Sequence, residues 1–143
     1  VAMQSPSAGS PVIKRGVVAI ARRNELFLAI RRGKTVVAGG RICFPGGHIE
    51  EGEGQREAVV RECAEELSAC VEAMECVWQN ISAWGTALSW WTIAVPEDAI
   101  LIPHPIEVDE IFWLSAERLL SEATLLEGNR EFLHGVQSGH IRL

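Results

Sequence analysis

A group of glutamates at fixed offsets behind a glycine turn constrains this chain more than any other feature. Pro45-Gly46-Gly47 forms the turn, Glu53 follows it, and residues 61–66 (RECAEE) add three more glutamates. Like charges three or four residues apart destabilise a bare helix by roughly 0.2–0.5 kcal/mol per pair. This crowding costs stability unless a cation lies among the carboxylates. We expect that cation to be a divalent metal that holds a phosphate compound.

The segment 54–67 is predicted to be a helix, because it contains good helix formers and no proline. Its apolar residues fall on one arc at about 100° per residue. These residues are Val59, Val60, Cys63, Ala64 and Leu67. Glu62, Glu65 and Glu66 fall on the neighbouring arc, because offsets of three and four share a helix face. One side of the helix should therefore pack on a sheet while the other presents three carboxylates.

Oxygen-only ligands select hard cations such as Mg²⁺ or Mn²⁺. Mg²⁺ takes a few protein carboxylates and completes its shell with water and substrate phosphates. A metal held in this way can polarise phosphoryl oxygens and activate a water, and a nearby glutamate can accept that water's proton. The alternative is an ordinary solvated acidic helix face. The set offsets of Gly47, Glu53 and Arg61 favour the metal site.

The same stretch resembles the Nudix box, the pattern G-x5-E-x7-R-E-U-x-E-E-x-G-U, in which U is a bulky aliphatic residue. The matching residues are Gly47, Glu53, Arg61, Glu62, Glu65 and Glu66. The preceding Phe44-Pro45-Gly46 is also usual for this family. Cys63 and Ala69 replace aliphatic residues of the pattern, and Ser68 replaces its second glycine. Ser68 bears on how the helix ends, because serine adopts the left-handed conformation less readily than glycine.

The resemblance implies an α/β fold, the alpha/beta/alpha sandwich of the Nudix family, with a mixed sheet and the box helix on one face. It implies hydrolysis of a pyrophosphate bond in a nucleoside triphosphate or other nucleoside diphosphate derivative, by water attack at phosphorus with Mg²⁺ or Mn²⁺. The implied metal ligands are the carbonyl of Gly46 and the carboxylates of Glu62, Glu65 and Glu66. Glu62 is alternatively the general base. Arg61 and Glu53 complete the expected catalytic group by holding the loop against the helix.

Three residues outside the box are expected to contact the substrate. Arg32 follows a predicted strand, and an arginine at this distance before Pro-Gly-Gly contacts the nucleotide in MutT-like Nudix enzymes. Phe44 precedes the turn. Asn129 matches an asparagine that hydrogen-bonds the purine in those enzymes, and its amide can read a base edge because it both donates and accepts. The alternatives are a solvated strand-end arginine and a helix-capping asparagine.

A further metal-binding glutamate is implied near the last predicted strand. Many family members have one six residues before a tryptophan, which is Glu107 before Trp113 in this chain. Glu110 is the second choice, since both acids lie in the pattern E-x-x-E-x-x-W. The alternative is that both are ordinary acids at a strand edge.

The order of predicted elements supports one mixed sheet with helices on both faces. Strands are expected at 12–21, 25–30, 42–44, 71–82, 87–95 and 106–114. Ser115 should cap a short helix at 116–121, and Gly128 or Asn129 should cap a final helix that ends near residue 136. Trp90 and Trp91 are adjacent in a predicted strand and should point to opposite faces of the sheet.

Composition limits the other possibilities. The chain has 143 residues, which we assign to a flexible tail at 1–11 and one domain at 12–143. The net charge is −6, and seven of the 19 acids lie between residues 50 and 66, so a basic nucleic-acid-binding surface is not expected. No apolar run is long enough to span a membrane. The four cysteines lack zinc-type spacing and indicate reduced thiols in a cytoplasmic protein.

Subfamily signals point to a small MutT-like enzyme whose partner is a nucleotide or a nucleoside diphosphate derivative. The chain contains no tyrosine, whereas diadenosine polyphosphate hydrolases have one downstream of the box. Trp84 stands where ADP-ribose pyrophosphatases have a proline. The competing function is that of a catalytically silent nucleotide sensor, in which the glutamates are normally eroded, and a homodimer is the assembly that the family suggests. Isopentenyl diphosphate isomerase uses a catalytic cysteine, but the pattern around Cys43 is not that of the isomerase.

Overall fold

The computed structural model describes residues 13–143, so the expected tail at 1–11 lies outside the described residues. The elements in chain order are β1 (Arg15–Ile20), β2 (Arg22–Arg23), β3 (Leu26–Arg32), β4 (Ile42–Cys43), β5 (Gly46–His48), α1 (Gln55–Leu67), β6 (Glu72–Ile81), β7 (Ala87–Ala94), β8 (Val108–Ser115), α2 (Ala116–Leu120) and α3 (Glu127–Ser138). Every predicted strand and helix is present with boundaries shifted by a few residues. Strands β2 and β5 are additional.

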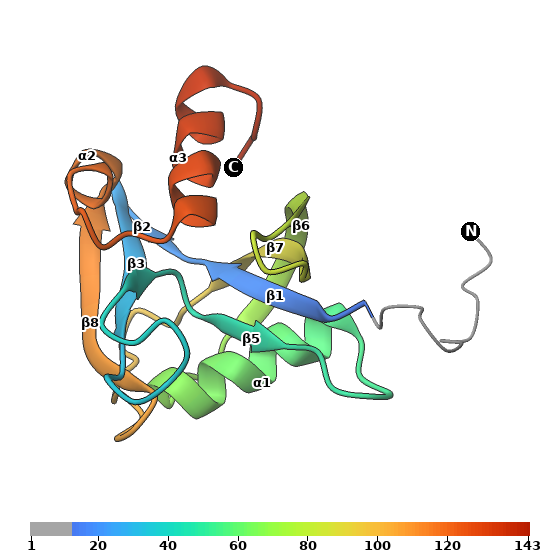
Figure 1. The fold of residues 1–143 in the computed structure, drawn as a ribbon. Helices are drawn as coiled ribbons and strands as arrows, with labels where there is room; N and C mark the ends of the chain where they lie inside the picture. The colour runs from blue at the N-terminus through green and yellow to red at the C-terminus, as the bar shows by residue number, and fades with distance from the viewer. Residues whose placement is uncertain (1–12) are drawn as a thin grey trace.

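The strands form two sheets, where the sequence suggested one. The first has the order β5-β1-β7-β6, in which β1 and β7 are parallel and the other pairs are antiparallel. The second contains β2, β3 and β4, with β8 paired antiparallel to β3. Figure 1 shows helix α1 on one side of β1 and helix α3 on the other. The mixed first sheet and its two helix layers confirm the predicted fold class.

Strand β1 lies between the two hydrophobic cores. Its residues are buried on both faces after the first, as is typical of a strand covered by helices on each side. Val17 and Ala19 belong to the core beneath α1, while Val18 and Ile20 belong to the core beneath α3. The alternation of these residues therefore directs even-numbered positions of β1 towards α3 and odd-numbered positions towards α1.

The adjacent tryptophans of β7 follow the same alternation, as predicted. Trp90 is fully buried in the α3-side core and stacks on Phe132 at 4.9 Å between ring centroids. Trp91 packs against the α1-side core, where its Nε1 donates a hydrogen bond to Gln55 Oε1 at 2.9 Å. Each tryptophan thus joins one helix to the sheet.

Helix α1 ends where the sequence left its exit open. Ser68 adopts the left-handed conformation, with φ 55° and ψ 31°, that a glycine usually occupies at this point. Its backbone N–H donates to the carbonyl of Ala64 at 3.1 Å, and the N–H of Ala69 donates to the carbonyl of Cys63 at 3.4 Å. Serine therefore closes the helix at Leu67, with the conformational cost that a residue with a Cβ has in this region.

The predicted cap of the last helix is wrong. Helix α3 begins at Glu127, and Leu126 occupies the N-cap position without a side-chain hydrogen bond. Gly128 and Asn129 both lie inside the first turn. The side chain of Asn129 is unavailable to the helix end because its oxygen accepts a hydrogen bond from the backbone of Phe44. Ser115 does cap α2 as predicted, through its hydrogen bond with the backbone N–H of Arg118.

Strand β5 follows directly from the Pro-Gly-Gly turn and is the edge strand of the first sheet. It pairs antiparallel with β1, so that Gly47 lies opposite Val17. A Cβ atom at Gly47 would lie 2.3 Å from the carboxyl carbon of Glu62, so only glycine allows this approach. Within residues 13–143, no helix has both the length and the apolar character needed to cross a membrane.

Candidate active site

Arg61 of helix α1 contacts three of the box glutamates. Its Nε lies 2.7 Å from Glu53 Oε2 and its Nη2 lies 2.9 Å from Glu53 Oε1, which is a bidentate pair. Its Nη1 lies 3.0 Å from both Glu62 Oε2 and Glu65 Oε1. The same guanidinium donates to the carbonyl of His48 at 2.9 Å. Arg61 therefore joins strand β5, the loop before α1 and the acidic face of α1.

The charge of this pair is strongly stabilised. Hydrogen bonds from Arg61 and from the backbone N–H of Glu50 lower the pKa of Glu53 to about 2. The Glu53 carboxylate in turn raises the pKa of Arg61 above its usual range. Both groups stay ionised throughout the pH range of enzyme action, so their contact is a constant electrostatic link between loop and helix.

Glu62 and Glu66 are buried, and their environment opposes ionisation. Burial raises the pKa of Glu62, against the opposing effect of Arg61. Burial and the neighbouring Glu62 raise the pKa of Glu66. Glu66 Oε1 accepts a hydrogen bond from the backbone N–H of Gly46 at 3.3 Å, and no cationic side chain among residues 13–143 pairs with it. A cation placed between these carboxylates would reverse both shifts.

The donor set fits a hard divalent metal. Two buried carboxylates adjoin the backbone of Gly46, and Glu65 lies one turn away from Glu62 with its side chain half exposed. In the described part of the chain no three acidic, cysteine or histidine side chains already converge as a complete ligand set, since Arg61 holds Glu62 and Glu65. All the available donors are oxygens, which suit Mg²⁺ or Mn²⁺. Ligation would require Glu62 and Glu65 to exchange Arg61 for the metal.

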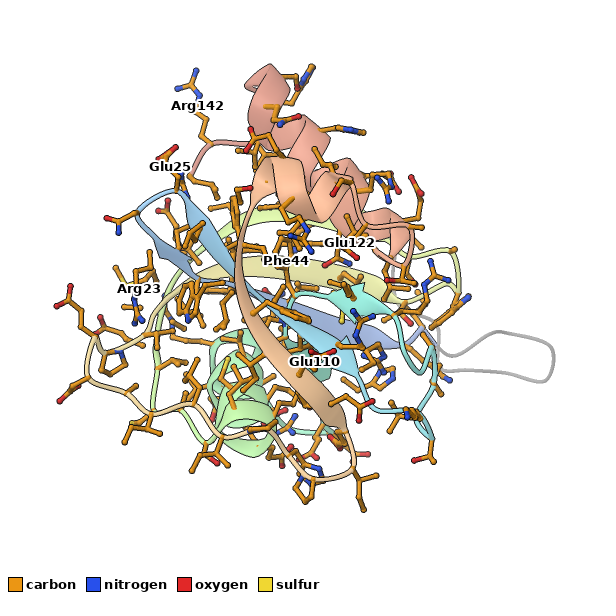
Figure 2. All side chains as sticks on the ribbon, turned by 90° about the vertical axis from the view of Figure 1, so that its left-hand side faces the viewer. Arg23, Glu25, Phe44, Glu110, Glu122 and Arg142 are labelled. Carbon is orange, nitrogen blue, oxygen red and sulfur yellow. The ribbon has the colours of Figure 1, made fainter. Side chains whose placement is uncertain are left out.

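The two candidate acids near β8 lie in different environments. Glu107 is close enough to Glu66 to raise the pKa of Glu66 further, which places it beside the acidic face of α1. Glu110 pairs with Arg31 at 2.8 Å on strand β8 and lies opposite Arg31 in the second sheet. Figure 2 shows Glu110 on β8. The first choice, Glu107, is therefore the acid that adjoins the box carboxylates.

Arg32 is engaged with its own loop in the structure. Its Nε donates to the carbonyl of Val37 at 2.7 Å, and its Nη1 lies 4.0 Å from the sulfur of Cys43. Cys43 is buried, and burial raises the pKa of its thiol to about 11 despite the opposing effect of Arg32. The electrostatic effect of Glu66 on this thiol shows that Cys43 also adjoins the acidic site. Arg32 and Glu66 thus approach the same buried thiol.

Phe44 and Asn129, far apart in sequence, are in direct contact. Asn129 Oδ1 accepts a hydrogen bond from the backbone N–H of Phe44 at 2.8 Å. The Phe44 ring lies in the α3-side core, with ring centroids 5.8 Å from Phe132 and 6.4 Å from Trp90. Figure 2 shows Phe44 within the interior of the molecule. Two of the three predicted substrate contacts therefore lie together, immediately before the Pro-Gly-Gly turn.

His104 is a residue at the site that the sequence did not single out. Its backbone N–H donates to the carbonyl of Glu66 at 2.9 Å. Its Nδ1 accepts hydrogen bonds from the backbone N–H groups of Ile106 and Glu107, each at 3.1 Å. His104 therefore holds the segment that bears Glu107 against the end of α1. A lone histidine between prolines carries no sequence signal for this role.

Comparison with known proteins agrees with this geometry. The MutT protein from Methanosarcina mazei Go1 superposes with a TM-score of 0.75 and 23% identity over 90% of this chain and 95% of that one. The E. coli ORF135 protein gives a TM-score of 0.72 and 28% identity, covering 92% of this chain and 94% of its own. An ADP-ribose pyrophosphatase from Streptococcus suis gives 0.66 and 16% identity, with 88% of each chain covered. A comparison with curated protein sequences finds no match.

The family itself is established by a match along most of the chain. The model of the NUDIX domain matches residues 12–136, which include every strand of the first sheet and helix α1 with its glutamates. The superposed MutT structures share the arrangement of sheets and helices. The glycine turn, the Arg61 contacts and the buried carboxylates are thus those of a Nudix box, and the chain belongs to the NUDIX domain family.

Proposed function

We propose that this chain is a Mg²⁺- or Mn²⁺-dependent hydrolase that cleaves a pyrophosphate bond in a nucleoside triphosphate or another nucleoside diphosphate derivative. The observation that carries this proposal is the buried carboxylate pair of Glu62 and Glu66. Among residues 13–143 Glu66 has no cationic partner, although burial of unpaired carboxylates is costly. A divalent cation carrying a phosphate chain would offset that cost.

The metal would supply charge neutralisation of the phosphoryl oxygens and activation of a water. Glu62, Glu65 and Glu66 would hold it, together with the carbonyl of Gly46 and with Glu107 as a further ligand. Glu62 is the alternative general base, since a carboxyl whose pKa is raised by burial accepts a proton more readily than an exposed one. Glu53 and Arg61 keep loop and helix in place without contacting the reacting atoms.

The other end of the substrate would lie near Phe44 and Asn129. The backbone N–H of Phe44 and that of Gly46 are two residues apart, which is about 7 Å along an extended chain. One is hydrogen-bonded to Asn129 and the other to Glu66. This spacing suits a nucleotide whose base reaches Asn129 while its phosphates reach the glutamates. Arg32 would then leave Val37 to contact a phosphate, as a guanidinium fork can.

A panel of nucleoside triphosphates and nucleoside diphosphate derivatives tests this function. With Mg²⁺ present, the wild type should release pyrophosphate or phosphate, while Glu62→Gln and Glu66→Gln should lose at least about a hundredfold in kcat. Equal inertness of all three proteins on every compound would contradict the hydrolase. Nucleotide binding without turnover by the wild type would instead support the sensor, which is the alternative function.

A further inference from the structure

Asn80 of strand β6 has one end of its amide fixed by a tryptophan. The Nε1 of Trp90 lies 2.7 Å from Asn80 Oδ1. An indole N–H can only donate, so the acceptor must be the amide oxygen of Asn80. The amide is planar, and its NH₂ group is therefore turned away from Trp90 as a donor. No hydrogen-bond partner for this NH₂ group lies among residues 13–143, and the side chain is half-buried.

Asn129 is oriented in the same way by a different donor. The backbone N–H of Phe44 can also only donate, so the bond at 2.8 Å fixes the Asn129 oxygen as its acceptor. Asn129 is 7% exposed. No buried side-chain nitrogen in the described part of the chain lacks a partner, so the Asn129 NH₂ group reaches the surface through this small exposed area. It too is presented as a donor.

The two amides lie at the same end of helix α3. A Cβ atom at Gly128, the residue before Asn129, would lie 3.9 Å from Asn80 Nδ2 and 3.8 Å from the Trp90 ring. Gly128 has no side chain that could cover the Asn80 NH₂ group. The start of α3 therefore places Asn129 beside Asn80 and leaves both donors uncovered.

The sheet places Asn80 in line with the box turn. Strand pairing puts Asn80 opposite Leu88, Leu88 opposite Gly16, and Gly16 opposite His48. This row lies on the face that α3 covers, because Val18, two residues along β1, packs in the α3-side core. From Asn80 to Gly16 the row spans two strand spacings, or about 10 Å. That width accommodates a nucleobase between Asn80 and the β5 edge.

We infer that Asn80 and Asn129 form a pair of amide donors that selects the substrate base, favouring a carbonyl over an exocyclic amino group at the contacted edge. The inference rests on the proposed nucleotide hydrolysis and names the base class for it. Carbonyl oxygens and ring nitrogens of bases accept hydrogen bonds, whereas exocyclic amino groups donate them. An amino group facing either asparagine NH₂ would leave two donors opposed and desolvated.

Inosine and adenosine triphosphates give a matched pair for the test. Hypoxanthine and adenine have the same ring and the same N7 acceptor, but hypoxanthine has an oxygen at C6 where adenine has an amino group. With Mg²⁺, the wild type should hydrolyse inosine triphosphate with a kcat/KM about tenfold or more above that for adenosine triphosphate. The ratio of the two values cancels any general effect on the phosphate chain.

Aspartate substitutions reverse the donor without breaking the orienting bond. In Asn80→Asp one carboxylate oxygen still accepts from Trp90, and the other oxygen replaces the NH₂ group. In Asn129→Asp one oxygen still accepts from Phe44. Each variant should shift the ratio towards adenosine triphosphate by about tenfold. Gln79→Glu is the control, because it makes the same charge change one residue away, where Gln79 contacts Ser89 and points to the opposite face.

The outcomes separate the two proposals. A wild type that treats both nucleotides alike, or an Asn80→Asp ratio that moves no more than that of Gln79→Glu, overturns the inference while leaving the hydrolase intact. A wild type that hydrolyses no nucleotide contradicts the hydrolase. In that case the ratio of dissociation constants for the two nucleotides, measured by calorimetry on the same three proteins, decides the inference. Thermal unfolding of each variant confirms that it is folded.

Discussion

Asn129 Oδ1 accepts a hydrogen bond from the backbone N–H of Phe44 at 2.8 Å, although 85 residues separate them. This bond joins the first turn of α3 to the residue that precedes the Pro-Gly-Gly turn. Two residues further on, the N–H of Gly46 donates to Glu66 of helix α1. The short segment 44–46 is therefore held by helices on both faces of the first sheet (Figure 1). Changes at either helix should be felt at the turn.

Replacement of Asn129 by leucine should destabilise the fold. The N–H of Phe44 would lose its acceptor in a buried position, which costs about 1–3 kcal/mol of unfolding free energy. Urea denaturation followed by fluorescence measures this change. Asn129→Asp, which retains an acceptor oxygen, should unfold at a urea concentration closer to that of the wild type. A leucine variant as stable as the aspartate variant would show that this bond contributes nothing to stability.

Glu53→Gln should lower activity more than stability. The change weakens the bidentate contact with Arg61, which keeps the loop and α1 in register, so we expect a kcat/KM loss of about 10–100-fold on the best nucleotide. Glu50→Gln is the matched control, because Glu50 lies 3.7 Å from Arg61 with an exposed side chain. A loss of equal size in both variants would argue against a specific role for the Glu53 contact.

The stability of the metal-free protein should fall as the pH rises from about 5.5 to 8.5. Burial raises the pKa of Glu62 and Glu66 in the folded state, so the folded protein binds more protons than the unfolded chain across this range. The stability that a protonated carboxyl contributes is complete below the ordinary carboxyl pKa and is lost as the pH approaches the raised value. The melting temperature, measured with chelator present, should fall by roughly 3–10 °C.

Glu66→Gln isolates the source of that pH dependence. The neutral amide removes the buried charge, so the fall in melting temperature should be clearly smaller than in the wild type. Glu65→Gln, with its half-exposed side chain, should retain the wild-type fall. Added Mg²⁺ or Mn²⁺ at pH 8 should raise the melting temperature of the wild type but not that of Glu66→Gln. Identical pH profiles for all three proteins would contradict the buried-charge explanation.

Ser68→Gly should stabilise the protein. Ser68 has φ 55° and ψ 31° at the end of α1, and a residue with a Cβ is strained there by about 1 kcal/mol relative to glycine. We expect the unfolding free energy to rise by about 0.5–1 kcal/mol after the added backbone entropy of glycine is counted. Ser68→Ala serves as the comparison and should give no such gain. A glycine variant less stable than the wild type would mean that the serine side chain contributes a compensating interaction.

The four thiols should divide into two reactivity classes. Cys70 and Cys76 are exposed, whereas Cys43 and Cys63 are buried with pKa values raised by burial to about 11 and about 12. Only the thiolate reacts rapidly with a disulfide reagent. At pH 8 the native protein should therefore titrate two thiols quickly, and the urea-unfolded protein should titrate four. Rapid reaction of Cys43 in the native state would show that this thiol is accessible near Arg32.

Helix α1 and its acidic face could be predicted from the sequence because their causes are local. The periodicity of apolar residues and glutamates depends only on helix geometry, and Arg61 reaches Glu65 within one turn. The predicted link between Arg61 and Glu53 agrees with the bidentate contact in the structure. The apolar alternation of β1 and β7 likewise predicted strands in the right places.

The division into two sheets could not be predicted in this way. Strand pairing joins residues far apart in sequence, and alternation shows that a strand has two faces without naming its neighbours. Strands β2 and β5 have two and three residues, too few for any pattern, and they exist because β3 and β1 are there to pair with them. The parallel contact of β1 with β7 is of the same non-local kind.

The sequence by itself determined the family pattern, the carboxylate face and the residue types that can hold a metal, because these depend on spacing along one helix and its loop. The tertiary structure alone decided which glutamates are buried, that Glu107 rather than Glu110 adjoins them, and that Asn129 holds Phe44 rather than the helix end. Burial and pairing depend on which distant segments pack together. The free energy of a buried carboxylate or amide is set by those neighbours, which local sequence does not name.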